Sequence, residues 1–164
     1  MIKVPSKRAS YFYAFVVSAF LLLSSIYLQM SAGLQPCPLC VLQRIAFILI
    51  AVLFLFGAVA KLRKIGNSVT AILASLSALL GIFLSGRQVW LQHTPNHADG
   101  TCAASLEYML QVLPFDQVLK NIFQGSVECT QVGWRFLALS LAEWSLICFV
   151  IFMIFSIWQL RRKK

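Results

Sequence analysis

Long stretches without a charged residue constrain this chain more than any other feature of its sequence. Four apolar runs are each long enough to cross a bilayer core of ~30 Å as a helix. In lipid, each segment must bond its own backbone polar groups, so these runs are expected to be helices. The sequence therefore predicts an all-α membrane protein, a four-transmembrane-helix bundle, and we expect residues 1–164 to form a single membrane domain. The predicted helices lie at about 11–30, 40–60, 70–90 and 141–160.

The charged residues indicate how the bundle is oriented. Ten of the fourteen basic residues lie in three clusters on one side of the apolar runs, and all five acidic residues fall on the other side. By the positive-inside rule the basic side is cytoplasmic, so both termini are expected inside. The net charge of +9 therefore indicates how the chain is oriented in the membrane. The basic residues are expected to contact the lipid bilayer rather than nucleic acid. The basic clusters are Lys3, Lys7 and Arg8; Lys61, Arg63 and Lys64; and Arg161, Arg162, Lys163 and Lys164.

The longer of the two outer segments, residues 91–140, has its own helical pattern. Apolar residues recur at helical spacing on both sides of Pro114, and Gly125 is a plausible stop signal. The sequence predicts a long periplasmic loop carrying short amphipathic helices that lie on the membrane surface. The apolar positions are Leu106, Met109, Leu110 and Leu113, then Val118, Leu119, Ile122 and Phe123.

Four cysteines fall on the outer side in this topology. Cys37-Pro38-Leu39-Cys40 opens the second apolar run, and Cys102 and Cys129 lie in the long loop. A Cys-x-x-Cys pair can form and break a disulfide within one turn of chain. Disulfides persist in oxidising compartments such as the bacterial periplasm. Two dithiol pairs in one small membrane protein predict thiol–disulfide redox chemistry, with electrons passed from pair to pair.

Other interpretations of the cysteines remain open at this point. A bridge between Cys102 and Cys129 could simply brace the loop, stabilising it by roughly 3–4 kcal/mol on the chain-entropy model. A zinc site could use Cys37, Cys40 and His93 with one loop cysteine, although a single Cys-x-x-Cys is a weak zinc signal. We therefore expect no metal. Cys148, in the middle of the last apolar run, is expected to be a small apolar filler.

Five further side chains are candidates for a ligand site. Arg44 lies one turn after Cys40, where it could stabilise a thiolate or an anionic ligand, or could reach lipid phosphate instead. Arg87 lies near the outer end of the third run, as a site residue or an interfacial lipid contact. His93 follows just outside and could exchange protons or be an exposed loop residue. Gln88 and Gln92 could hydrogen-bond a polar ligand head.

These residues together resemble the disulfide bond formation protein B family, bacterial membrane enzymes that oxidise a periplasmic thiol oxidase using quinone. The resemblance covers almost the whole chain. It implies a four-helix fold in the bacterial inner membrane with the active cysteines periplasmic. The matching stretches are Pro36 to Cys40 with Gln43 and Arg44, Gly86 to His93, Cys102, Leu106 to Leu110, Gly125 to Cys129, and Trp134.

The resemblance also implies a role for each cysteine. Cys37 and Cys40 would be the quinone-coupled pair, with Cys40 nearest the quinone. Cys102 and Cys129 would exchange with the partner, a periplasmic DsbA-type thioredoxin-fold oxidase, with Cys102 forming the mixed disulfide. The function implied is reoxidation of that partner, with electrons passing through both pairs to quinone.

The quinone itself would be ubiquinone or menaquinone from the membrane pool. Arg44 would border its ring with His93 nearby, and Arg87 completes the set of candidate quinone-binding residues. A related four-helix quinone-linked protein of the vitamin K epoxide reductase type is one rival interpretation, although the position of the Cys-x-x-Cys favours the first family. A non-enzymatic membrane protein with structural disulfides is the other.

Overall fold

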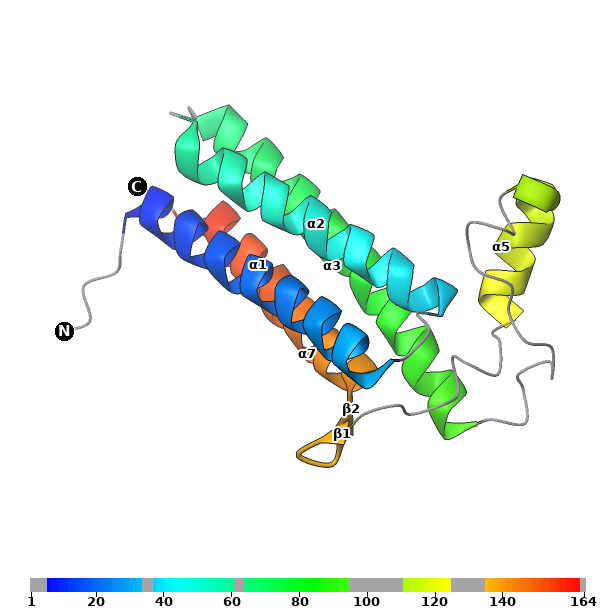
Figure 1. The fold of residues 1–164 in the computed structure, drawn as a ribbon. Helices are drawn as coiled ribbons and strands as arrows, with labels where there is room; N and C mark the ends of the chain where they lie inside the picture. The colour runs from blue at the N-terminus through cyan, green and yellow to red at the C-terminus, as the bar shows by residue number, and fades with distance from the viewer. Residues whose placement is uncertain (1–5, 34–36, 61–63, 95–110, 125–134, 163–164) are drawn as a thin grey trace.

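Four long helices packed antiparallel make up most of the molecule (Figure 1). The computed structural model describes residues 6–33, 37–60, 64–94, 111–124 and 135–162. The end of the bundle at which α1 begins and α7 ends is called the basic end, and the opposite end, where α2 begins, is called the cysteine end. The long helices are α1 (Lys7–Ala32), α2 (Pro38–Val59), α3 (Lys64–His93) and α7 (Leu141–Arg161).

Each of these helices is long and apolar enough to cross a membrane. The chain is therefore an all-α, multi-pass membrane protein, as the apolar runs predict. Helices α1 and α3 extend past the predicted limits at both of their ends, because an apolar run marks the lipid segment while the helix continues into polar flanks. Ser6 caps the start of α1, where its Oγ accepts from the Ala9 N–H at 3.3 Å. Gly33 ends α1 with a φ of 60°.

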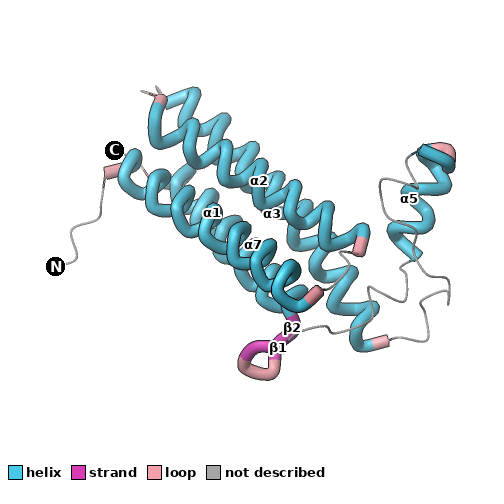
Figure 2. The backbone as a smooth tube through the Cα atoms, in the orientation of Figure 1, coloured by secondary structure: helices cyan, strands magenta, loops and turns pink. Residues whose placement is uncertain are grey.

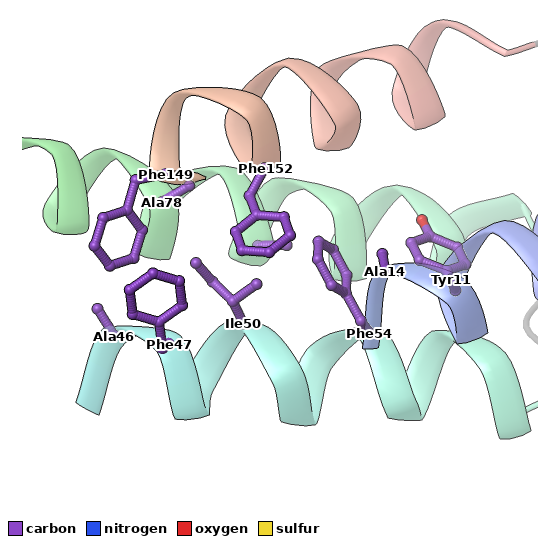
Figure 3. Packing of buried hydrophobic residues seen from close by; sticks show 10 residues of the cluster. Tyr11, Ala14, Ala46, Phe47, Ile50, Phe54, Ala78, Phe149 and Phe152 are labelled. Carbon is purple, nitrogen blue, oxygen red and sulfur yellow. The ribbon is translucent and has the colours of Figure 1, made fainter. Parts of the chain in front are cut away.

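Aromatic rings from α2 and α7 meet at the centre of the bundle (Figure 3). The ring centroids of Phe47 and Phe149 are 4.2 Å apart, and those of Phe54 and Phe152 are 5.8 Å apart. Lipid is as apolar as these side chains, so close packing rather than exclusion from water holds such helices together. The contacts of these rings thus set how α2 and α7 are placed relative to each other.

Small residues on α3 make room for this aromatic layer. Ala74, Ala78 and Gly81 follow one another at helical spacing, and the alanines belong to the same buried cluster as Phe149. A Cβ atom at Gly81 would overlap the Phe149 ring. The absence of a side chain at Gly81 is therefore what lets α3 and α7 approach each other at this level.

The start of α7 is fixed by a capping box that follows a two-stranded hairpin. Ser140 Oγ accepts from the Glu143 N–H at 3.3 Å, and the Glu143 carboxylate accepts from the Ser140 N–H at 2.6 Å. Strand β1 (Arg135–Phe136) pairs antiparallel with β2 (Leu139–Ser140). Leu137 and Ala138 turn the hairpin with φ of 53° and 67°, a conformation that usually calls for Asn or Gly. For that reason the sequence does not predict this hairpin.

The outer loop contributes one described helix, α5 (Phe115–Gln124). It begins directly after Pro114, where the second amphipathic segment was predicted, and Val118 and Ile122 on one of its faces are buried. Figure 2 shows α5 beside the cysteine end of the bundle. Leu106, Met109 and Leu110 of the first predicted segment lie outside the described residues, as does the predicted stop at Gly125, whereas Leu113 of that segment is described and packs against the cluster of Val118 and Ile122.

The close approach at Gly81 makes a prediction about stability. Gly81→Ala should destabilise the bundle by about 1–3 kcal/mol, because a methyl group must displace the buried Phe149 ring. Gly86→Ala, on the same helix, is the matched control, since a Cβ there would meet no atom within 4 Å and alanine favours the helix. Thermal unfolding of both variants in one detergent, followed by circular dichroism, measures the difference. Equal midpoints would show that Gly81 does not limit the approach of α3 to α7.

Candidate functional site

The Cys37–Cys40 pair lies at the first turn of α2. Cys37 is the N-cap residue and Pro38 occupies the first turn, where its missing N–H costs nothing. The Cys37 sulfur accepts from the Cys40 N–H at 3.4 Å, and a hydrogen bond at 2.8 Å joins the two sulfurs. The short step from that distance to the ~2.05 Å of a disulfide makes the pair competent for reversible oxidation. The helix N-terminus also favours negative charge on the Cys37 sulfur.

Two buried glutamines form the polar side of this pair. Gln88 on α3 donates its Nε2–H to the Cys40 sulfur at 3.2 Å and to the Cys37 sulfur at 3.7 Å. Gln43 on α2 donates to Gln88 Oε1 at 2.6 Å. Sequence reasoning named Gln88 only as a possible contact of a polar ligand, and it gave Gln43 no role. The two glutamines are 45 residues apart in the sequence, so no local sequence pattern indicates that they are in contact.

Apolar side chains enclose the rest of the pair. Cys37 is 4% exposed and Leu39 is fully buried. Both belong to a cluster with residues of α3 and of α5. Helix α5 therefore covers Cys37 from the loop side, while Cys40 is half-buried at the edge of the cluster. The other buried members of the cluster are Leu84, Leu91, Val118 and Ile122.

Arg44 lies one turn deeper in α2 and reaches across to α1. It is half-buried, and its Nη2 donates to the Ser25 carbonyl at 3.4 Å. Gln29 lies one turn from Ser25 along α1, and its Oε1 is buried with no hydrogen-bond partner in the part of the chain that the structure describes. A cationic donor and an unsatisfied acceptor thus occur at neighbouring levels of the α1–α2 interface. Sequence reasoning did not single out Gln29.

The other two predicted ligand residues lie on α3. Arg87 is half-buried, directly before Gln88. His93 is the last residue of α3; its Nδ1 is 2.9 Å from the Val89 carbonyl and its Nε2 is 3.9 Å from Glu143 Oε1. His93 follows Gln88 by five residues on the same helix. It therefore lies ~140° around the axis of α3 from Gln88, on the side that faces α7. These contacts of His93 do not test its predicted place beside a quinone, which stays a prediction.

The second cysteine pair, Cys102 and Cys129, lies outside the described residues. Within the described ranges, no three side chains of His, Cys, Asp or Glu gather closely enough to hold a metal ion. Cys148 lies in α7, half-buried, and packs against the aromatic core.

Comparison with known proteins identifies the family that the chain resembles. The sequence model of the family described as "Disulfide bond formation protein DsbB" matches residues 7–159. A disulfide bond formation protein B of Stutzerimonas stutzeri is 37% identical over 161 residues, or 98% of this chain and 99% of that protein. Disulfide bond formation protein B 1 of Pseudomonas aeruginosa is 40% identical over 158 residues, covering 96% and 97% of the two chains. A disulfide bond formation protein B of Hahella chejuensis is 41% identical over 147 residues, covering 90% and 89%.

The cover provided by α5 can be tested by its effect on the cysteine pair. Ile122→Asn should raise the rate at which a water-soluble maleimide labels Cys37 by roughly tenfold. Burying an amide in the apolar cluster costs ~1–3 kcal/mol, which favours dissociation of α5 from the bundle. Lys120→Asn, on the exposed side of α5, is the control and should leave the rate unchanged. Labelling of the reduced protein is read for the Cys37 peptide by mass spectrometry. The same rate in both variants would contradict the shielding role.

Proposed function

The chain belongs to the DsbB family of disulfide bond formation proteins, and we propose that it reoxidises a periplasmic DsbA-type dithiol oxidase and passes the electrons to quinone. The family makes it a disulfide-forming membrane oxidoreductase. The observation that carries the proposal is the hydrogen-bonded Cys37–Cys40 pair at the start of a membrane helix. A dithiol there lies within reach of a lipid-soluble acceptor, and we propose that the loop pair brings it the electrons of a soluble partner.

Thiol–disulfide exchange defines the proposed electron path. A partner thiolate attacks Cys102 in a Cys102–Cys129 disulfide, and the partner's second thiolate then releases the partner in its oxidised form. The reduced loop pair next attacks the Cys37–Cys40 disulfide, so that its own disulfide is restored and Cys37 and Cys40 become a dithiol. Each step forms one S–S bond and breaks another, with a thiolate as nucleophile and a thiolate as leaving group.

The residues around Arg44 fit a quinone. Arg44 offers N–H groups and positive charge, and the buried Gln29 Oε1 lacks a partner within the described structure. A quinone needs a donor at its oxygen, and a quinol needs an acceptor for its hydroxyl, so the two side chains complement both forms. A bound ubiquinone or menaquinone would supply a two-electron, two-proton acceptor. Arg44 would stabilise negative charge there. Arg87 and His93 remain further candidates for this site.

The proposed location is the bacterial inner membrane, with the cysteine end facing the periplasm. The basic residues Lys7, Arg8, Arg161 and Arg162 all occur at the opposite end of the bundle. The positive-inside rule places that end, with both termini, in the cytoplasm. The membrane quinone pool would then be within reach of the Cys37–Cys40 pair, and the loop pair would meet a soluble partner in an oxidising compartment.

Quinone dependence is the central test of this function. Purified protein stripped of quinone should oxidise no more of a reduced DsbA-type partner than its own disulfides allow, whereas added ubiquinone should give continuous turnover. Partner oxidation is followed by gel shift after thiol labelling. Cys40→Ser should abolish turnover, and Cys148→Ala, in the aromatic core of the bundle, should retain it. Equal rates with and without quinone would overturn the proposal.

Arg44 gives a second, independent test. Arg44→Ala should raise the apparent KM for quinone roughly 10- to 100-fold, the range expected for loss of a hydrogen bond to a charged group. Arg44→Lys should be intermediate, since it keeps the charge but loses the planar donor fork. Arg161→Ala, an exposed residue at the basic end, serves as the control. If Arg44 only anchors the helix in lipid, both variants should keep a normal KM and be less abundant in membranes.

A further inference from the structure

We propose that Gln88 is a catalytic hydrogen-bond donor to the Cys40 thiolate, and that Gln43 is the positioning residue that orients it. The inference rests on the proposed function and adds to it the group that stabilises the reacting sulfur. It starts from two distances: 3.2 Å from Gln88 Nε2 to the Cys40 sulfur and 2.6 Å from Gln43 Nε2 to Gln88 Oε1.

Besides the hydrogen bond that joins them, the two sulfurs differ in their contacts with the backbone and with Gln88. The Cys37 sulfur accepts from the Cys40 N–H at the helix N-terminus, at 3.4 Å. The Cys40 sulfur accepts from Gln88, a side chain on a different helix, at 3.2 Å, and Gln88 is farther from Cys37 at 3.7 Å. A change at Gln88 can therefore alter Cys40 more than Cys37, which makes the role of the glutamine separable from that of the helix.

Gln43 fixes which end of the Gln88 amide faces the sulfurs. A glutamine side chain can present either its oxygen or its NH₂ group, and only the NH₂ group can donate to a thiolate. Because Gln43 donates to Gln88 Oε1, the Gln88 NH₂ group is left facing Cys40. Gln43 is 5% exposed and Gln88 is 6% exposed, so water competes little with this arrangement. In such surroundings, hydrogen bonds to a charged group are strengthened.

The donor acts at one defined step. When an incoming thiolate attacks the Cys37 sulfur, a new S–S bond forms at Cys37 and the Cys37–Cys40 bond breaks. The electron pair of the broken bond stays on the Cys40 sulfur. The Gln88 N–H stabilises that charge where it develops and holds Cys40 as the thiolate. Arg44 donates to the Ser25 carbonyl, whereas the neutral amide of Gln88 donates to the Cys40 sulfur.

The pH dependence of Cys40 alkylation tests the assignment without any need for quinone. Reduced protein in detergent is treated with iodoacetamide across a pH series, and the Cys37 and Cys40 peptides are quantified separately by mass spectrometry. Gln88→Leu should move the Cys40 midpoint upward by about one pH unit, since a hydrogen bond to a charged group contributes about that much. Gln88→Glu should move it further, because a carboxylate replaces the donor. The Cys37 midpoint should move less.

Gln92→Leu is the matched control for the Gln88 variants. Gln92 lies one turn further along α3, where its Oε1 accepts from Ser140 Oγ at 2.8 Å. It should leave the Cys40 midpoint unchanged. Gln88→Asn keeps the amide but shortens it by one methylene, so it should shift the midpoint in the same direction even if the leucine variant folds poorly.

A double-variant cycle tests the positioning role of Gln43. Gln43→Leu should move the Cys40 midpoint by part of the Gln88→Leu shift, because the amide is no longer held in one orientation. Combining the two substitutions should give no more than the Gln88→Leu shift, since Gln43 acts only through Gln88. Additive shifts would show that Gln43 acts on Cys40 by another route and would overturn its positioning role.

Redox equilibrium with glutathione, measured above the alkylation midpoints, gives a second readout. Losing a thiolate donor should make the Cys37–Cys40 disulfide about tenfold more stable relative to the dithiol, a shift of ~30 mV toward reducing potentials. An unchanged Cys40 midpoint in Gln88→Leu and Gln88→Asn would overturn the inference. Quinone-independent turnover would instead overturn the proposed function and leave these titrations unaffected, so the two failures can be told apart.

Discussion

The 2.6 Å hydrogen bond between Gln43 and Gln88 joins α2 to α3 beside the cysteine pair, and the geometry of the redox centre depends on it. A buried amide in an apolar bundle must find partners, and here each glutamine supplies part of what the other needs. The arrangement leaves one NH₂ group directed at the sulfurs. Without it, the NH₂ group of Gln88 would not be held toward the cysteines.

The position of α3 makes that hydrogen bond possible. Gly81 lets α3 approach Phe149 closely, and Gln88 lies seven residues, about two turns, further along the same helix. Because helices packed in lipid depend on close contact rather than on exclusion from water, the small residue fixes both the depth and the rotation of α3. A substitution in the middle of the bundle can therefore displace a donor at the cysteine end.

The sequence predicts the fold and the start of the site well, and predicts the contacts of the site poorly. Four membrane helices follow from length and polarity alone because lipid leaves the backbone no alternative. The position of Cys37 and Cys40 at a helix start follows from the Pro38 that accompanies them. The approach of Gln88 to Cys40 depends on how α3 is rotated against α2, which involves residues far apart in the chain. Because His93 follows Gln88 by five residues on α3, it faces α7, where its Nε2 is 3.9 Å from Glu143 Oε1.

The cost of charge in a membrane explains why different groups serve the thiolate and the proposed acceptor. An uncompensated charge at depth is expensive, so a permanent cation beside Cys40 would need a partner whenever the pair is oxidised and neutral. A neutral amide has no such requirement, and Gln43 satisfies the oxygen of Gln88 without any contribution from the sulfurs. The charge of Arg44 is partly compensated by its hydrogen bond to the Ser25 carbonyl. Ser25 lies one helical turn from Gln29, whose Oε1 is buried. In the proposed mechanism, Arg44 would then bind an anion that forms only transiently, while the amides would hold the sulfur that supplies the electrons.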